Sequence, residues 1–229
     1  MANTRSQIRD LCRRRLGDLA VPYEWSDLQV NQWINDAIGD YNLHFPLAAS
    51  LELETQAGQN AYDLESPGLR RVSSVEYPTS EGGPALENQL ARRDHTRPGF
   101  LAQAGFYDVE YSPSAASEIR LWLSGPVAAG TARLKGTTDH AYLDDDSDES
   151  SLPERHLELV MLYVRWAAFQ ELAIGASADP DPTSLALGTL ELNAYRAQRL
   201  YLTALAECLK AESESRVIQW KFDQWDRVY

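Results

Sequence analysis

An apolar helical pair from Pro153 to Leu209, divided by a proline-containing turn, is the feature that most constrains this chain. Before the turn, apolar residues recur at three- and four-residue steps on nearly every side, which predicts a helix covered all round. Pro180 and Pro182 cannot continue a helix, because proline lacks an N–H group and clashes with the preceding turn. After the turn, apolar residues again recur at helical steps, and several residues on that face are small. We therefore expect a second, long helix folded back on the first.

Two helix-start motifs precede this pair. Thr4 with Gln7, and Ser26 with Gln29, have the spacing of capping boxes, and each is followed by apolar residues at helical steps. The sequence therefore predicts two N-terminal helices.

Two groups of side chains on these helices can be interpreted from their positions. The cluster Arg13 to Arg15 ends the first helix, where cations complement the helix dipole, so we expect it to be solvated. Trp33 and Trp166 fall on apolar faces, and we predict that both are largely buried.

From Leu51 onward the apolar period changes from 3.6 to 2. Segments 51–55 and 61–64 flank a glycine-containing loop and predict a hairpin. Further strands are expected at 71–77, 106–111, 118–123 and 131–136. Together they predict a small antiparallel sheet inserted between the second and third helices.

The predicted fold class is therefore α+β. It comprises a four-helix bundle with a long C-terminal helical hairpin, a small antiparallel β insertion between helices 2 and 3, and an extended C-terminal tail. The expected domain limits are residues 1–48 for the N-terminal helices, 49–140 for the insertion, 141–212 for the hairpin and 213–229 for the tail.

The composition excludes several classes of function. A net charge of −13 argues against non-specific binding to a nucleic-acid backbone, which needs clustered Lys and Arg. No segment is expected to span a membrane, and the N-terminus lacks a signal peptide, so we place the protein in a cytoplasm. Cys12 and Cys208 lie on apolar helix faces, which favours buried thiols over a disulfide or a metal site.

Residues that could carry catalysis are sparse. The four histidines lie in separate segments without metal-ligand spacing, and no nucleophile motif or phosphate loop is present. The acidic run Asp144 to Glu149 lacks the glycine and the distal glutamate of a calcium loop. We therefore interpret it as a solvated segment that leads into a helix. We expect no cofactor and no metal. The polar cluster Arg92 to Arg97 is the one candidate for an enzyme site, and a surface loop is the preferred interpretation.

The last residues differ most from their surroundings. Ile218, Trp220 and Phe222 alternate with polar residues, which favours an extended strand, and Trp225 and Tyr229 add further aromatic rings. Aromatic residues dominate interface hot spots. We therefore predict that these five residues bind another protein chain by strand addition. The alternative is that the tail folds back on its own helices.

The order of the segments resembles the head-to-tail adaptor (connector) proteins of tailed bacteriophages. The resemblance rests on an arginine-rich first helix, on Tyr23 to Leu28 leading into Trp33 to Ala37, on a β insertion, on Leu152 to Arg155, and on Asn193 to Gln198 in a long last helix. It implies a structural virion protein, assembled in the host cytoplasm. It also implies a ring, usually of twelve copies, that docks under the portal protein, contacts downstream neck or tail proteins, and surrounds the DNA exit channel without binding DNA specifically. On this resemblance, the expected partner of the five C-terminal residues is the portal protein or a neighbouring subunit.

Two alternatives to this function remain open. The protein could be another neck component, such as a stopper or tail-completion protein, which would share the acidity and ring assembly. It could also be a small enzyme with an unrecognised site near Arg92 to Arg97.

Overall fold

The computed structural model describes residues 3–64, 68–79, 88–111, 119–177 and 184–225, with the side chains of 184–186 and 214–225 outside this description. The chain divides into two compact units. The helical unit comprises Met1–Phe45 and His140–Tyr229, and the β unit comprises Pro46–Asp139. Each unit has a hydrophobic core of its own.

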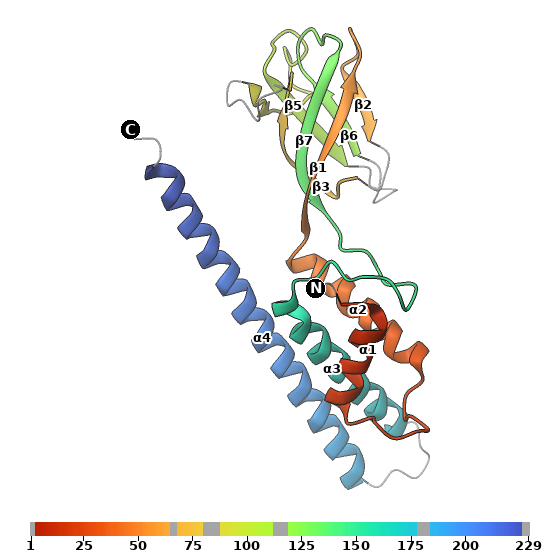
Figure 1. Cartoon of the computed structure of the whole chain (residues 1–229). Helices are drawn as coiled ribbons and strands as arrows, with labels where there is room; N and C mark the ends of the chain where they lie inside the picture. The colour runs from red at the N-terminus through yellow and green to blue at the C-terminus, as the bar shows by residue number, and fades with distance from the viewer. Residues whose placement is uncertain (1–2, 65–67, 80–87, 112–118, 178–183, 226–229) are drawn as a thin grey trace. The chain divides into compact units, whose positions relative to one another are not determined.

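Four α-helices make up the described part of the helical unit (Figure 1). They are α1 Arg5–Leu16, α2 Asp27–His44, α3 Leu157–Ser177 and α4 Ser184–Trp225, and a short 3-10 helix, η2 Glu154–His156, precedes α3. Both predicted capping boxes are formed, at Thr4 and at Ser26. Because each box satisfies backbone N–H groups that no helix can satisfy for itself, the starts of α1 and α2 are encoded locally.

Helix α3 lies at the centre of the helical core and packs against α1, α2 and α4. Val160, Val164 and Ala168 are fully buried in it. By length and composition, Glu154–Ser177 would also be long and apolar enough to cross a membrane. A core helix meets the same criterion, and contact with three other helices accounts for its apolar composition.

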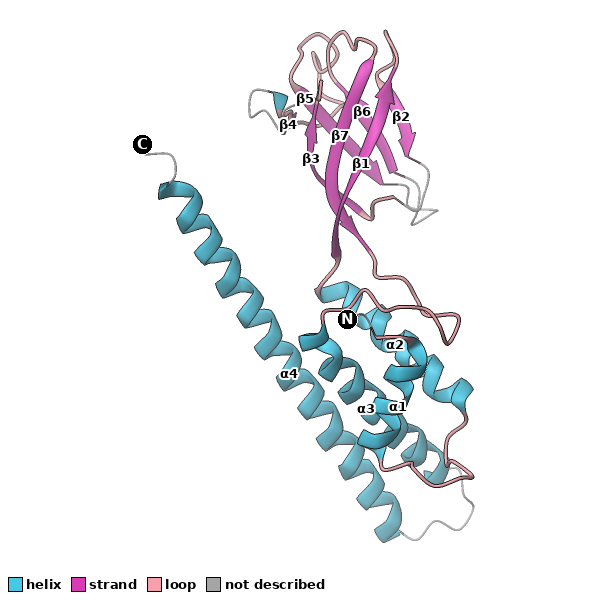
Figure 2. Cartoon of the chain, in the orientation of Figure 1, coloured by secondary structure: helices cyan, strands magenta, loops and turns pink. Residues whose placement is uncertain are grey.

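The β unit contains two sheets, drawn in magenta in Figure 2. Its strands are β1 Leu47–Thr55, β2 Ala61–Leu64, β3 Arg71–Glu76, β4 Ala91–Arg92, β5 Phe106–Tyr111, β6 Ile119–Leu123 and β7 Gly130–Thr138. One sheet has the order β1-β7-β3 and the other the order β2-β6-β5-β4. The short β4 pairs with β5 in parallel, and the other pairs are antiparallel. Apolar residues from both sheets form one core.

Strand β7 is the centre of the three-stranded sheet, and its Gly136 is sterically required. Gly136 pairs with Ala49 on one side and with Val72 on the other, beside a register shift in β3. A Cβ atom at this position would lie 1.9 Å from the carbonyl oxygen of Arg71. Only glycine therefore allows the two backbones to approach this closely.

The predicted α+β class holds, but the predicted four-helix bundle is wrong. Helix α1 has 12 residues and α4 has 42, so the helices do not enclose one core of common length. Helix α4 contributes Tyr201 and Leu205 as buried members of that core.

Two further parts of the predicted fold are also wrong. The single small antiparallel sheet is replaced by two sheets, and the expected hairpin is absent, because β1 pairs with β7 and β2 pairs with β6. The extended C-terminal tail is replaced by helix, since α4 continues to Trp225. Glu, Lys, Gln and Arg have good helix propensity, and the short alternation of apolar and polar residues is not enough to oppose them. The finer domain limits stay a prediction.

Candidate functional site

The residues predicted to bind a partner lie at the C-terminal end of the chain. Ile218, Trp220, Phe222 and Trp225 are on the helical backbone of α4, and their side chains lie outside the described part of the structure. Tyr229 lies outside the described residues altogether. On a helix, positions four and three apart share a face, so a contact here would use a helix face instead of a strand edge.

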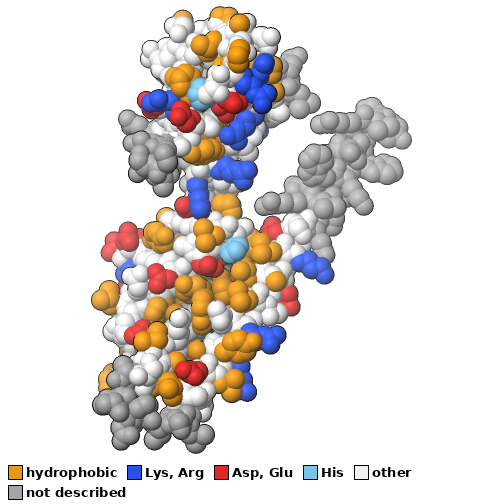
Figure 3. Space-filling model, turned by 180° about the vertical axis from the view of Figure 1, so that it is seen from behind, with side chains coloured by type: hydrophobic (Ala, Val, Ile, Leu, Met, Phe, Trp, Pro, Cys, Tyr) orange, Lys and Arg blue, Asp and Glu red, His pale blue; other side chains and the backbone are white. Residues whose placement is uncertain are grey.

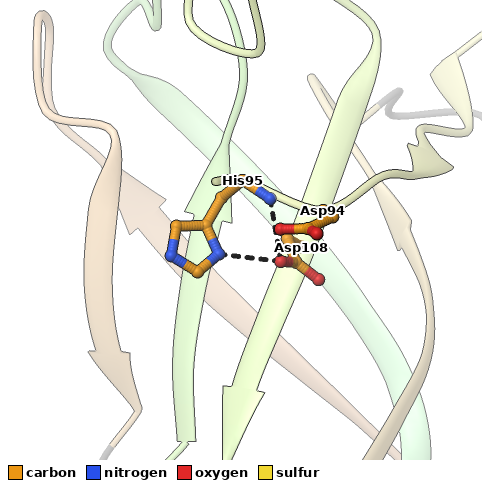
Figure 4. Close-up of side chains that lie close together, drawn as sticks. All are labelled: Asp94, His95 and Asp108. Carbon is orange, nitrogen blue, oxygen red and sulfur yellow. Dashed lines mark hydrogen bonds and ion pairs between the residues drawn. The ribbon is translucent and has the colours of Figure 1, made fainter. Parts of the chain in front are cut away.

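The polar cluster near Arg92 to Arg97 is organised around two strands of the β unit (Figure 4). His95 stacks on Trp122 of β6, with ring centroids 4.6 Å apart and planes inclined by 3°. Its Nδ1 atom lies 2.8 Å from Oδ2 of Asp108 on β5. Because an ionised carboxylate only accepts, Nδ1 carries the proton. Sequence reasoning missed Asp108 and Trp122, since only strand pairing brings them beside His95.

Asp94, His95 and Asp108 offer ligand atoms within 4.8 Å of one another, so a metal centre has to be considered. Three of their four carboxylate oxygen atoms accept hydrogen bonds from described residues. Asp108 accepts backbone N–H groups from His95 at 3.0 Å and Val109 at 2.8 Å, and Asp94 accepts the backbone N–H and hydroxyl of Thr96. Burial opposes ionisation of Asp108, but these donors outweigh it and lower the pKa of its carboxyl. The cluster therefore fastens a loop to β5, and the expectation of no metal stays a prediction.

The acidic run Asp144 to Glu149 is likewise engaged within the chain. The carboxylate of Asp146 accepts hydrogen bonds from Arg9 and Arg5 of α1, which lower its pKa to about 2. The carboxylate of Asp148 accepts the backbone N–H groups of Asp144 and Asp145, both at 2.8 Å. Most of the run is exposed, as expected of a solvated segment, and in addition it holds the segment before α3 against α1.

The two thiols have no activating environment. Cys12 is fully buried, and burial raises the pKa of its thiol to about 12. Burial also raises the pKa of Cys208, and the nearby Glu207 adds to this effect. The thiolate is the reactive form of cysteine, so both groups are poor nucleophiles at neutral pH.

An open groove runs along α2 of the helical unit, with a volume of about 570 Å³. We call it the acidic groove, and it is lined by Gln32, Asn35, Asp36, Gly39, Asp40, Leu43, Tyr142, Asp144 and Tyr163. Leu43 and Tyr142 are 64% and 57% exposed. Burial and the charges of Asp36 and Asp40 raise the pKa of the Tyr163 phenol. The groove thus combines negative charge with exposed apolar surface.

Gly39 shapes one wall of the acidic groove. A Cβ atom at this position would lie 3.2 Å from the hydroxyl oxygen of Tyr142, closer than ordinary van der Waals contact. Glycine within a helix costs about 1 kcal/mol relative to alanine. Its place in the middle of α2 lets the Tyr142 ring lie against the helix.

A second surface of the helical unit lies on α4. Ala197, Tyr201 and Leu205 are its buried residues among those described, so the opposite side of the helix faces away from the core. We call that side the α4 outer face, and its exposed residues are Leu192, Tyr195, Arg196, Arg199, Leu202 and Thr203. Figure 3 shows one face of the unit on which hydrophobic and acidic side chains gather, with basic side chains along one edge. Exposed apolar surface rimmed by charge is typical of protein contacts.

Comparison with known proteins agrees with a role in protein assembly. The family model described as SU10 adaptor protein matches residues 3–219, nearly the whole chain. A search of curated proteins finds none that matches. The match includes both the helical unit and the inserted β unit, so it does not depend on one motif. The chain therefore belongs to the SU10 adaptor protein family and is a structural adaptor protein of a bacteriophage.

Proposed function

We propose that this protein forms a ring, of twelve copies, that docks under the portal protein in the neck of the virion and surrounds the DNA exit channel. The observation that carries the proposal is the family match over residues 3–219. The two exposed surfaces of the helical unit support it, because a ring subunit must offer surface to a neighbour on each side. The subunits assemble in the host cytoplasm, contact downstream neck or tail proteins, and serve a structural role without catalysis.

The charge of the chain suits a channel through which DNA slides. Each subunit carries a net charge of −13. Lumen-facing carboxylates would repel the DNA backbone over roughly 8 Å at physiological salt. We therefore expect no measurable affinity of the isolated protein for duplex DNA at moderate salt.

The C-terminal part of α4 is the proposed contact with the portal protein. Ile218, Phe222 and Trp225 are spaced by four and three residues, so on the helical backbone their positions share one face. Trp220 and Tyr229 complete the proposed docking residues. An amphipathic helix laid into a hydrophobic groove is a common recognition mode, and it takes the place of strand addition here.

The proposal is tested by mixing the purified chain with portal oligomers and measuring the mass of the complex by native mass spectrometry. We expect a complex of defined stoichiometry that contains twelve adaptor copies. A chain that binds only a pre-formed portal and adaptor complex would be a stopper or tail-completion protein. A chain that remains monomeric in the presence of all neck components would contradict the proposed function.

The docking residues are tested separately, by removing residues 216–229 and by the single change Phe222→Ser. Both changes should weaken portal binding while the β unit and the rest of the helical unit stay folded. Far-ultraviolet circular dichroism of each variant checks the folding. Gln219→Ser is the matched control, because it alters a polar residue in the same segment. Unchanged portal binding after the truncation would show that this segment is not the docking element.

A further inference from the structure

Helix α4 is long, and part of its described surface is not covered by its own chain. Helix α4 has 42 residues and α3 has 21, which correspond to about 63 Å and about 32 Å at the rise of an α-helix. Leu192, Tyr195 and Leu202 on the α4 outer face are 45%, 56% and 51% exposed. Exposing three large apolar side chains to water on one helix face is unfavourable, and burial of these side chains against another molecule would lower the free energy.

The charged residues of the α4 outer face are also uncompensated. Arg196 and Arg199 lie among the exposed apolar side chains and have no ion-pair partner in the part of the chain that the structure describes. Guanidinium groups are the preferred cations of protein interfaces, because they are weakly hydrated and bind carboxylates through two parallel hydrogen bonds. This face therefore fits a partner that offers both carboxylates and apolar surface.

The acidic groove has the complementary chemistry. Asp36 accepts one hydrogen bond, from Gln32 at 2.9 Å. Among the described residues neither the Asp36 nor the Asp144 carboxylate forms an ion pair, although the Arg5 guanidinium donates to the backbone carbonyl of Asp144. Asp40 accepts the Tyr201 hydroxyl. Burial, this hydrogen bond and the charge of Asp40 raise the pKa of the Tyr201 phenol, and burial with the charges of Asp36 and Asp40 raises the pKa of Tyr163. The carboxylates of Asp36 and Asp144 can therefore still pair with a cation from another molecule.

We propose that the α4 outer face of one subunit docks in the acidic groove of a second copy of this chain, with Arg199 facing Asp36 and Arg196 facing Asp144. This proposal rests on the ring assembly of the proposed function and assigns the surfaces that build it. The exposed Leu43 and Tyr142 of the groove lie against the apolar residues of the helix.

A second copy is favoured as the occupant because both halves of the contact are present in every chain. The two surfaces differ, so a contact made once between each pair of neighbours is heterologous. A heterologous contact generates a ring when its rotation closes. The groove volume of about 570 Å³ is within the range of sites that enclose ligands, so it can take several side chains of a neighbouring helix.

The test exchanges charge across the contact in the full-length protein. Asp36→Arg alone and Arg199→Glu alone each place like charges opposite each other in every interface of a homogeneous ring. Like charges at an interface cost several kcal/mol, so the concentration needed for ring formation should rise at least about tenfold. Ring formation is measured by native mass spectrometry and sedimentation velocity, with portal oligomers added if the wild-type ring needs them.

An equimolar mixture of the two variants should restore the ring. In an alternating arrangement, the arginine introduced at position 36 of one variant meets the glutamate introduced at position 199 of the other, and the remaining contacts are of the wild-type kind. Asp10→Arg and Arg14→Glu are the matched controls, because they make the same charge changes at exposed positions on α1, outside both surfaces. A second pair, Asp144→Lys with Arg196→Glu, repeats the test at the other end of the contact and decides the case if one variant of the first pair fails to fold.

The outcomes separate this proposal from the proposed function. Loss of the ring in each variant, with recovery in the mixture, supports the contact. Wild-type-like rings in the single variants, no recovery in the mixture, or loss of portal binding with intact rings would overturn the contact and leave the adaptor role standing. A wild-type chain that neither forms a ring nor binds the portal would contradict the proposed function itself.

Discussion

The Tyr41 hydroxyl oxygen lies 2.6 Å from Nδ1 of His156 and joins the C-terminal half of α2 to the short 3-10 helix that precedes α3. Both side chains are buried. Burial, with a contribution from Glu212, raises the pKa of the Tyr41 phenol to about 12. Tyr41 is therefore neutral at every physiological pH, and its hydroxyl can donate to the unprotonated nitrogen of His156.

Acid should weaken the helical unit through His156. Burial and the neighbouring Arg155 lower the folded-state pKa of His156 below its ordinary value of 6.5. The unfolded chain then takes up the proton first, so the stability contributed by neutral His156 is present above about pH 6.5 and is lost as the pH falls through the folded-state pKa. We expect the melting temperature to fall over this window in the wild type and to fall less steeply in His156→Gln.

His44→Gln is the control for this pH dependence, because His44 lies in the same unit and is partly exposed. Thermal melts followed by circular dichroism between pH 5 and pH 8 measure the slopes. Equal slopes in the wild type and in His156→Gln would show that another group is responsible.

Arg13 should be the most costly arginine to remove. It was expected in a solvated cluster, but it is 4% exposed, and this prediction is wrong for Arg13. It forms ion pairs with Asp18 and Asp27, donates to the Trp25 carbonyl at 3.0 Å, and lies 3.9 Å from the centre of the Tyr23 ring. Removing one partner of a buried ion pair leaves an uncompensated charge, which costs about 3 to 5 kcal/mol.

Urea unfolding of Arg13→Ala measures this loss, with Arg14→Ala as the control. Arg14 is exposed, and surface changes of this kind usually shift the free energy of unfolding by less than about 0.5 kcal/mol. Similar midpoints for the two variants would contradict a structural role for the Arg13 network.

Gly136→Ala should destabilise the β unit. The added methyl group would overlap the Arg71 carbonyl oxygen, so the central strand β7 would have to move away from β3. Overpacking of this kind costs about 1 to 3 kcal/mol. Gly188→Ala makes the same chemical change on α4, where no described atom outside the neighbouring helix backbone lies within 4 Å of the added carbon. That control should be neutral or stabilising by about 1 kcal/mol, since alanine favours the helix. Guanidinium unfolding measures both, and equal shifts would refute the steric explanation.

Local signals in the sequence predicted the helices and strands better than they predicted which of them contact one another. The capping boxes at Thr4 and Ser26 predicted two helix starts, because all of their hydrogen bonds lie within four residues. Trp33 is buried as predicted, whereas Trp166 is partly exposed and stacks on Tyr201 of α4. That stacking depends on how α4 crosses α3, which helical periodicity does not specify.

The pairing of strands was beyond local reasoning for a physical reason. Alternation in 51–55 shows that one face is buried, but it does not show which strand lies beside it. The partner of Leu53 is Ala132, far along the chain, and the predicted hairpin partner pairs elsewhere. The sequence likewise pointed to Arg92 to Arg97 without Asp108. The acidic groove was missed because its carboxylates come from two segments that meet only in the folded chain.

Asp108 provides the last prediction, since it decides between a fastening role and a metal role for its cluster. Asp108→Asn removes the charge that receives the Nδ1–H group of His95, so the His95 loop should loosen from β5. Loss of hydrogen bonds to a charged group costs about 1.5 to 3 kcal/mol, and the emission of Trp122, on which His95 stacks, should change with it. Asp94→Asn is the control at an exposed carboxylate whose hydrogen bonds, among the described residues, come from Thr96.

Zinc or calcium at 1 mM should leave the melting temperature of the wild type unchanged. A metal bound with a Kd of about 10 μM would instead stabilise the fold by about 2.7 kcal/mol at that concentration, and such a rise, if abolished by Asp108→Asn, would establish the metal role.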